Sequence, residues 1–320
     1  TEISRGALMS QQDPQESAEA TAQATGTNGA SGGAAAGAAP QSGGWLANLR
    51  NRALSGIPAL AVVLAVIALA PSFVLSLVVT AAGAVGIAEY QRLLPEPLRQ
   101  RVRLELLVGA AVLIGLGGLA LGYLGMGLGL FVTVAAVTAA VWVREPHPSQ
   151  DGLSAAGAAA FGLVLIPWLL THAALIHGLP GGAGMLAMLV VVLSLNDIFA
   201  YLIGSLLGSR PLMPTVSPHK TVEGAIAGLV GGVAGGFLTW VWLLSFPNGP
   251  GFSEALGLGA GLAVVGQMGD LVESKLKRLV DVRESGTFLP GHGGLLDRLD
   301  SYFFAAPALY YYIVLTDSYF

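Results

Sequence analysis

Long runs of apolar residues alternate with short polar stretches along most of this chain. A bilayer core about 30 Å thick is crossed by about 20 residues of helix. Runs near this length predict nine transmembrane helices, at residues 57–71, 72–90, 104–122, 124–143, 153–177, 183–207, 222–246, 253–276 and 299–316. The first two are short and meet at Pro71 and Ser72, so a count of eight stays open.

These runs make the expected fold all-α and polytopic, with about nine transmembrane helices and a polar cavity that faces the cytoplasm. The first 44 residues differ, because they are rich in Ala, Gly, Ser, Thr and Gln and hold almost no large apolar side chains. Such a segment buries too little surface to offset its ordering entropy. We predict a disordered low-complexity tail at 1–44, N-terminal transmembrane helices at 45–180 and a C-terminal catalytic transmembrane region at 181–320.

Composition supports a membrane protein and excludes several kinds of chemistry. The 320 residues are 54% hydrophobic and 11% charged, whereas soluble domains carry about 25% charged residues. The chain has no cysteine, so disulfides, thiolate zinc sites and a cysteine nucleophile are excluded. The net charge of −4 provides no broad positive surface for nucleic acid, and we expect no nucleic-acid partner.

The lysines and arginines are segregated. With nine helices, all fifteen fall in the N-terminal tail or in connectors on one side, and the connectors near Gly125, Pro180 and 247–251 have none. Short loops that are rich in lysine and arginine usually lie on the cytoplasmic side of the membrane. We therefore expect the N-terminus and the basic loops to be cytoplasmic.

Charge also concentrates within one segment. Of the 34 formal charges, eleven lie between Asp270 and Asp300, a segment that opens inside a predicted transmembrane helix. Asp270 and Glu273 are three residues apart and share a helical face. Asp197 is a third acid within a predicted span. Intramembrane acids usually face a polar cavity or an ion, although Glu273 fits an ordinary helix-end charge equally well.

The same segment carries an extended motif that resembles the phosphatidate cytidylyltransferases, also called CDP-diacylglycerol synthases. The motif runs Ser274-Lys275-Leu276-Lys277-Arg278, four residues, Arg283-Glu284-Ser285-Gly286, two residues, then Leu289-Pro290-Gly291-His292-Gly293-Gly294-Leu295-Leu296-Asp297-Arg298-Leu299-Asp300. Two upstream blocks, 196–204 and 217–224, resemble the family in order and spacing. The resemblance covers roughly residues 50–320.

The resemblance implies a nucleotidyltransferase of phospholipid biosynthesis that converts CTP and phosphatidate into CDP-diacylglycerol and diphosphate. It places metal ligation, by Mg²⁺, at Asp270 and Asp297. A second, monovalent cation such as K⁺ is a further expectation. The implied partners are CTP, phosphatidate or a related lipid phosphate, and the bilayer, with a homodimer as the implied assembly. The implied location is the bacterial cytoplasmic (inner) membrane, with the active site on the cytoplasmic side.

Joining two anionic phosphates requires positive charge and in-line positioning but no covalent nucleophile. The candidate phosphate-contacting and catalytic residues are Lys220, Arg278, Arg283, His292 and Arg298, besides Asp270 and Asp297. The candidate substrate-binding residues are Asp197, Ser217, Glu273, Glu284, Gly293 and Gly294, the glycines by freeing backbone N–H groups for phosphate. Two alternatives stay open: His292 as a plain turn residue, and Ser217-Pro218 as a helix cap and start, with Thr221 serving the cap.

Two departures from the family pattern bear on function. Arg283-Glu284 stands where the family usually has Lys-Asp, and His219 stands where it usually has Lys. The charges at 283 and 284 keep their sign, but Arg is a planar fork and Lys a point charge. The alternatives are therefore a cytidylyltransferase homologue that acts on another lipid phosphate, or a transporter-like membrane protein, for which intramembrane acids are also typical.

Overall fold

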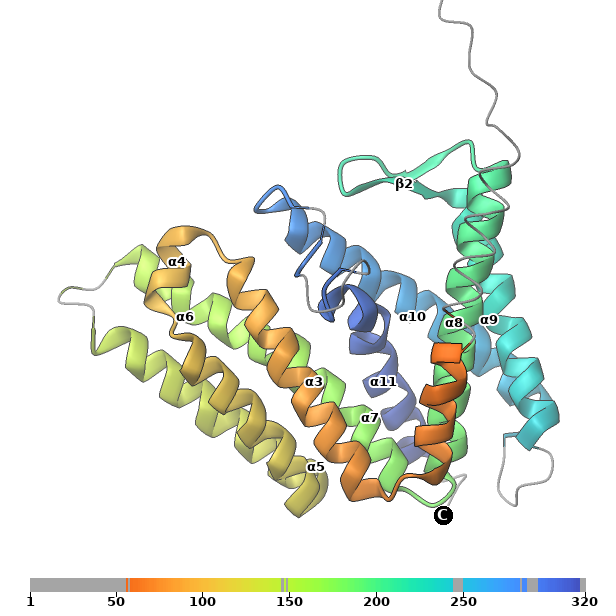
Figure 1. The fold of residues 1–320 in the computed structure, drawn as a ribbon, viewed down its shortest axis with the longest axis horizontal. Helices are drawn as coiled ribbons and strands as arrows, with labels where there is room; N and C mark the ends of the chain where they lie inside the picture. The colour runs from red at the N-terminus through yellow and green to blue at the C-terminus, as the bar shows by residue number, and fades with distance from the viewer. Residues whose placement is uncertain are drawn as a thin grey trace, which may run out of the picture. The chain divides into compact units, whose positions relative to one another are not determined.

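The computed structural model describes residues 56, 58–144, 147, 149–243, 250–282, 284–286 and 293–316. The predicted tail at 1–44 lies outside these residues, and the division at 180 is not tested. The described part is helical apart from one small hairpin (Figure 1). After a short helix, Pro58–Leu69, the elements are α3 (Ser72–Arg92), α4 (Glu96–Arg101), α5 (Leu104–Trp142), α6 (Gln150–Leu163), η1 (Val164–Trp168), α7 (Leu169–Gly178), α8 (Gly182–Leu207), β1 (Pro211–Met213), β2 (Ser217–Thr221), α9 (Val222–Leu243), α10 (Phe252–Arg278) and α11 (Leu296–Thr316).

Six of the described helices are long and apolar enough to cross a membrane, with Gln150–Gly178 taken as one. They agree with an all-α membrane protein. Pro58–Leu69 is apolar but shorter, and α11 has the length of a span, 21 residues, without being among the six. The count of nine, which needs both, stays a prediction.

The long helix α5 folds back on itself at Gly122. This residue has φ 60° and ψ −142°, outside the helical region. A Cβ on Gly117 would stand 2.4 Å from the Gly125 carbonyl oxygen, and eight residues of straight helix would put these groups about 12 Å apart. The two arms of α5 therefore correspond to the separately predicted helices at 104–122 and 124–143.

The predicted helix at 153–177 is continuous in the structure but contains a π-helical turn, η1. Pro167 lies inside that turn, and a proline has no N–H to donate within a helix. A wider π turn accommodates the missing bond, a common role of single π turns. The helix then continues through α7 to Gly178.

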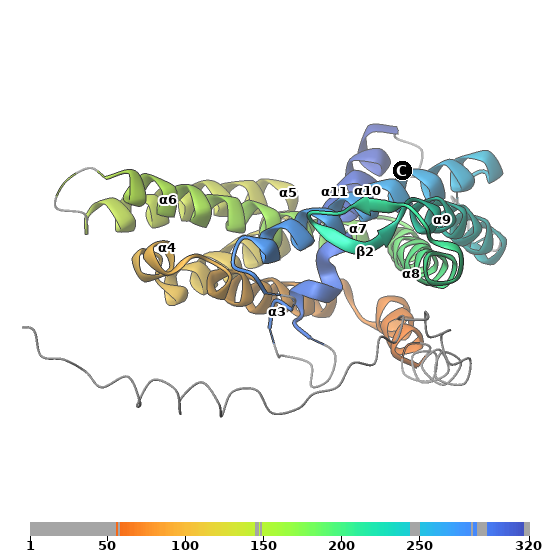
Figure 2. The ribbon, with the colours of Figure 1, turned by 90° about the horizontal axis from the view of Figure 1, so that it is seen from above.

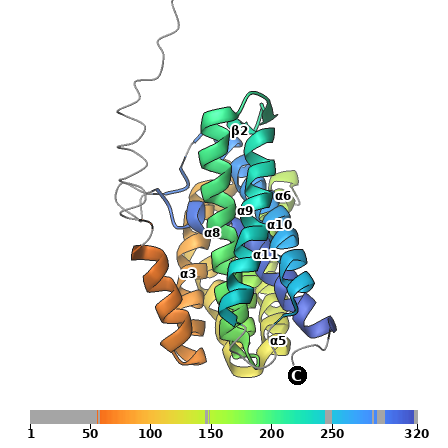
Figure 3. The same ribbon diagram turned by 90° about the vertical axis from the view of Figure 1, so that its right-hand side faces the viewer.

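Helices α8, α9 and α10 pack side by side and carry most of the site (Figure 3). A Cβ on Gly236 of α9 would stand 2.2 Å from the carbonyl oxygen of Ala255 on α10, so glycine permits this close crossing. The core has two apolar clusters, and α11 contributes to both, with Leu296 and Phe303 in one and Leu309 and Ile313 in the other. Accordingly α11 runs between α3 and α7 on one side and α8 and α10 on the other (Figures 1 and 2).

The hairpin of β1 and β2 was not expected from the sequence. It is antiparallel, with Pro211 opposite Thr221 and Met213 opposite Ser217, and it lies at one end of α8 and α9 (Figure 3). The interpretation of Ser217-Pro218 as a helix cap and start is therefore wrong, because α9 begins at Val222. The alternative for Thr221 is confirmed, since its hydroxyl accepts the N–H of Gly224 at 3.1 Å.

Candidate active site

A cavity of about 580 Å³ lies at the hairpin end of the helices, between α8, α9, α10 and β2. The structure brings four of the predicted site residues to its wall: Asp197, Ser217, Lys220 and Asp270. They come from three elements that span more than seventy positions of the chain. His219, one of the two departures from the family pattern, also lines this wall.

The hairpin reaches α10 through charged side chains. Lys220 of β2 forms an ion pair with Asp270 of α10. Arg278, at the end of α10, donates from Nε to the carbonyl oxygen of Val216 at 3.0 Å and from Nη1 to that of Val282 at 3.4 Å. In this structure Arg278, predicted to contact phosphate, thus holds the hairpin turn against α10.

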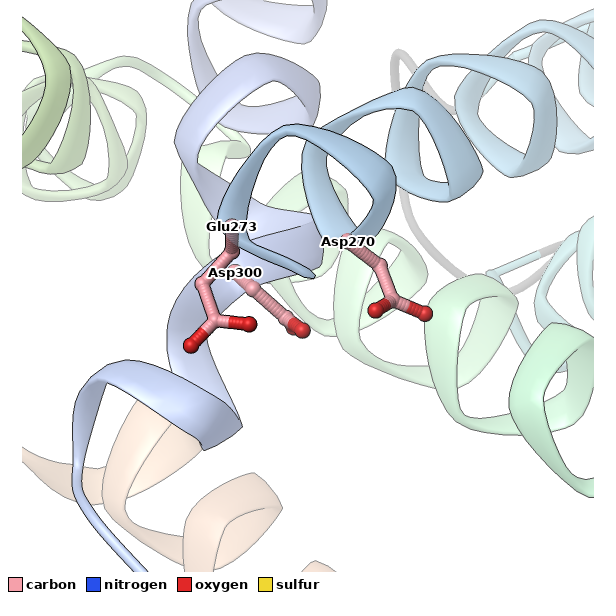
Figure 4. A group of neighbouring side chains, drawn as sticks. All are labelled: Asp270, Glu273 and Asp300. Atoms are coloured by element: carbon pink, nitrogen blue, oxygen red, sulfur yellow. The ribbon is translucent and has the colours of Figure 1, made fainter. Parts of the chain in front are cut away.

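Three carboxylates gather beside the cavity. Oxygens of Asp270, Glu273 and Asp300 all lie within 4.8 Å of one another, and Figure 4 shows the three on the same side of α10, with Asp300 supplied by α11. The first two were predicted site residues, but no role was assigned to Asp300. The available signal was its spacing of three residues from Asp297, which puts the two on neighbouring positions of one helical face.

This acidic group fits a divalent cation with hard oxygen ligands. Glu273 is 1% exposed, and neither of its carboxylate oxygens accepts a well-aligned hydrogen bond from any described residue. Its nearest charge partner is the Lys277 ammonium, 2.6 Å from Oε2. Buried carboxylate oxygens usually accept hydrogen bonds. Oxygens that lie close together without such bonds are available as ligands for Mg²⁺, which prefers oxygen ligands.

Asp297 lies outside this group of three and is joined to it by Lys277. The Lys277 ammonium lies 2.8 Å from Asp297 Oδ1 as well as close to Glu273. Asp297 also accepts the N–H of Ser285 at 3.0 Å and that of Gly294 at 2.8 Å. The metal role of Asp297 stays a prediction, and Lys277 is a site residue that sequence reasoning missed despite its place in the motif.

The rest of the motif is only partly described. Arg283 and His292 lie outside the described residues. Gly293 has φ 82°, a conformation that favours glycine, and Glu284 lies beside it. Gly294 donates its N–H to Asp297, so in this structure that group does not face a substrate. Arg298 is exposed at the first turn of α11.

Two amide side chains that sequence reasoning missed, Asn196 and Gln267, also line the cavity. Asn196 donates to Asp197 Oδ1 at 2.9 Å. Gln267 donates to Asn196 Oδ1 at 2.7 Å and to the carbonyl oxygen of Ala225 at 3.1 Å. This chain of hydrogen bonds links α8, α9 and α10 at the cavity and holds the Asp197 carboxylate.

The site of this mainly helical membrane protein combines cationic side chains with a cluster of carboxylates beside one cavity. Such a combination suits a polyphosphate together with a divalent cation. The family model for the cytidylyltransferase family matches residues 50–316, and the chain belongs to that family.

Several individual proteins are similar to this chain. The Bacillus subtilis phosphatidate cytidylyltransferase is 45% identical over 125 residues, which cover 39% of this chain and 45% of that protein. The Synechocystis phosphatidate cytidylyltransferase is 46% identical over 119 residues, 37% of this chain and 39% of that protein. The Escherichia coli uncharacterized protein YnbB is 35% identical over 216 residues, 61% of this chain and 68% of that protein. The match thus spans less than half the length of these two phosphatidate cytidylyltransferases.

Proposed function

We propose that this protein is a phosphatidate cytidylyltransferase, which converts CTP and phosphatidate into CDP-diacylglycerol and diphosphate. The observation that carries the proposal is the meeting of Lys220 with Asp270, and of Asp270 with Glu273 and Asp300, beside one cavity. Family membership and the names of the relatives support the same reaction. CTP and phosphatidate are the proposed partners.

In this reaction a phosphate oxygen of phosphatidate attacks the α-phosphorus of CTP, and the bond from that phosphorus to the bridging oxygen of the diphosphate breaks. Negative charge spreads over the phosphate oxygens in the transition state. Lys220 and Lys277 are within the described site and supply positive charge, and Arg283, Arg298 and His292 are further candidates. Ser217 and the Gly293 turn are proposed to position phosphate groups.

The proposed cofactor is Mg²⁺, held by Asp270, Glu273 and Asp300, with Asp297 as a further ligand. Such an ion supplies charge neutralisation at the triphosphate. Lys220 pairs with Asp270, and Lys277 pairs with Glu273 and Asp297, so cationic side chains already contact three of these four carboxylates. A monovalent cation such as K⁺ is a further proposed component.

Location follows from the substrates. Phosphatidate lies in the bilayer and CTP in the cytosol, so we place the hairpin end of the helices, with the cavity, at the cytoplasmic face of a bacterial inner membrane. Elements with basic residues, α4 and β2, lie toward that end in Figure 1, and the positive-inside rule supports this orientation. A homodimer is the proposed assembly.

The decisive experiment uses the purified full chain in detergent with labelled CTP, Mg²⁺ and phosphatidate. We expect a labelled CDP-lipid and an equal amount of diphosphate. A parallel panel of other lipid phosphates addresses the second candidate, a related acceptor, which the Arg283-Glu284 departure favours. If no lipid phosphate yields product and CTP does not bind, both enzyme proposals are wrong.

A further inference from the structure

Glu89 of α3 is a buried carboxylate that contacts the C-terminal motif segment from outside it. Its side chain is 3% exposed. Its oxygens accept the N–H of Leu295 at 3.0 Å, the N–H of Leu296 at 2.8 Å and the hydroxyl of Ser285 at 3.3 Å. These partners lie 196 to 207 positions further along the chain.

The contact caps the beginning of α11. The first N–H groups of a helix have no partner within the helix, and negative charge at this end is favourable. Leu296 is the first residue of α11, so Glu89 satisfies donors that would otherwise be buried and unpaired. A buried carboxylate is costly unless it accepts such bonds, and three donors from one segment stabilise it here.

Glu89 and Asp297 hold the same few residues. Ser285 gives its hydroxyl to Glu89 and its N–H to Asp297. A Cβ on Gly294 would stand 2.2 Å from Ser285 Oγ and 2.7 Å from Glu89 Oε2, and one on Gly286 would stand 2.5 Å from Glu89 Oε1. Two glycines of the motif thus leave room for the Glu89 carboxylate.

We propose that Glu89 is a positioning residue of the active site: it sets the start of α11, and thereby places Asp297 and Asp300 against Lys277, Glu273 and Asp270 of α10. Asp297 and Asp300 lie in the first two turns that follow the capped N–H groups. Glu89 itself is not among the residues of the cavity wall, so it acts through this helix and not on substrate. The role in catalysis rests on the function proposed above.

The test compares Glu89→Gln with Glu105→Gln, a matched control at an exposed glutamate at the first turn of α5. Glutamine keeps the size of the side chain but turns an NH₂ group toward N–H or O–H donors. We expect the amides of Leu295 and Leu296 to exchange hydrogen about tenfold faster in Glu89→Gln, since a hydrogen bond to a charged group is worth at least that factor. Exchange in α8 and α9 should stay as in the wild type, and Glu105→Gln should match the wild type throughout.

In the activity arm, Glu89→Gln should lower kcat about tenfold or more while KM for CTP stays within about twofold, because transition-state geometry changes and the cavity wall does not. Glu89→Asp, which keeps the charge, should recover part of the loss. Ser285→Ala removes only one donor and should give a smaller change in the same direction. It also serves where Glu89→Gln is not recovered folded.

Unchanged exchange at Leu295 and Leu296 in Glu89→Gln would overturn the proposal, as would an equal increase across all helices, which indicates global destabilisation. Equal loss of kcat in Glu89→Asp and Glu89→Gln, without the local exchange change, would also contradict it. A wild type inactive on every lipid phosphate would contradict the proposed function alone, because the exchange comparison still decides whether Glu89 positions α11.

Discussion

At the scale of single residues, Asp270 connects the basic hairpin residue Lys220 with the cluster of carboxylates on α10 and α11. It pairs with Lys220 of the hairpin and lies within 4.8 Å of carboxylates from α10 and α11. Asp270 was predicted from its place within an apolar helix and from the family resemblance. Lys277 and Asp300 lie in the motif that runs from Ser274 to Asp300. How α10 and α11 cross decides which of their side chains meet, and the spacing of residues along each helix does not specify that crossing.

Asp270→Asn should reduce turnover by well over tenfold, a loss above about 1.4 kcal/mol of transition-state stabilisation, because the amide has no charge to hold a divalent ion. Asp297→Asn is expected to act in the same way. The measurement is CDP-lipid formation at saturating Mg²⁺, with detergent thermal stability as the check on folding. Asp151→Asn is the matched control, because Asp151 is exposed and its ion pair within the described part of the chain is a surface contact with Arg101 at 3.4 Å. A variant at 270 or 297 that kept more than about a tenth of wild-type kcat would remove that residue from the ligand set.

The double change Arg283→Lys with Glu284→Asp restores the family's usual pair. If the wild-type pair performs the usual task, activity on phosphatidate should stay within about tenfold, since both charges keep their sign. If the pair instead selects another acceptor, the double variant should gain more than about tenfold on phosphatidate and lose activity on the native lipid. Wild type and variant are compared on phosphatidate and on lipid phosphates made from the source membrane.

At the scale of elements, the short hairpin and the turn inside α5 are local structures that interrupt the helical pattern. Residues 208–221 were expected only as a connector between helices. In the structure they form strands β1 and β2, held to α10 by Lys220 and Arg278. A two-stranded hairpin alone is only marginally stable in water, so these contacts with α10 stabilise it. The residues of the segment itself do not predict those contacts.

Gly122 provides a test of the turn in α5. Gly122→Ala should destabilise the protein by about 1 to 3 kcal/mol, because φ 60° with ψ −142° is strained for a residue with a Cβ. Gly127→Ala in the same helix is the control. A Cβ added at either glycine would meet no atom within 4 Å beyond its own chain neighbours, so the two positions differ in backbone conformation and not in space. The midpoint of thermal unfolding in detergent is the measurement, and equal midpoints would contradict the strained turn.

At the scale of the whole molecule, the proposed activity and the proposed location both depend on which end of the helices faces the cytoplasm. The basic elements α4 and β2 lie toward one end of the helices in Figure 1, and the bend between the two arms of α5 lies toward the other. A cavity at the hairpin end is reached by CTP only if that end faces the cytosol.

Single cysteines placed in the cysteine-free chain test this orientation. Cysteines at His147 and at Leu279, both exposed, should label only from the cytoplasmic side, and one at Asn248 only from outside. Labelling of positions 248 and 279 from the same side would contradict the nine-helix arrangement.

The amino-acid sequence by itself determined the class of this protein, since a run of apolar residues must form a helix where no water can satisfy its backbone. It also pointed to several charged groups of the proposed site, because Asp197 and Asp270 stand out against apolar surroundings and the family resemblance marks Lys220. Only the tertiary structure decided which side chains contact one another in the site. Glu89 looks like one more polar residue near the end of α3, and its three contacts lie about two hundred positions away. The crossing of α3, α10 and α11 brings them together, and such crossings arise from packing among many side chains at once.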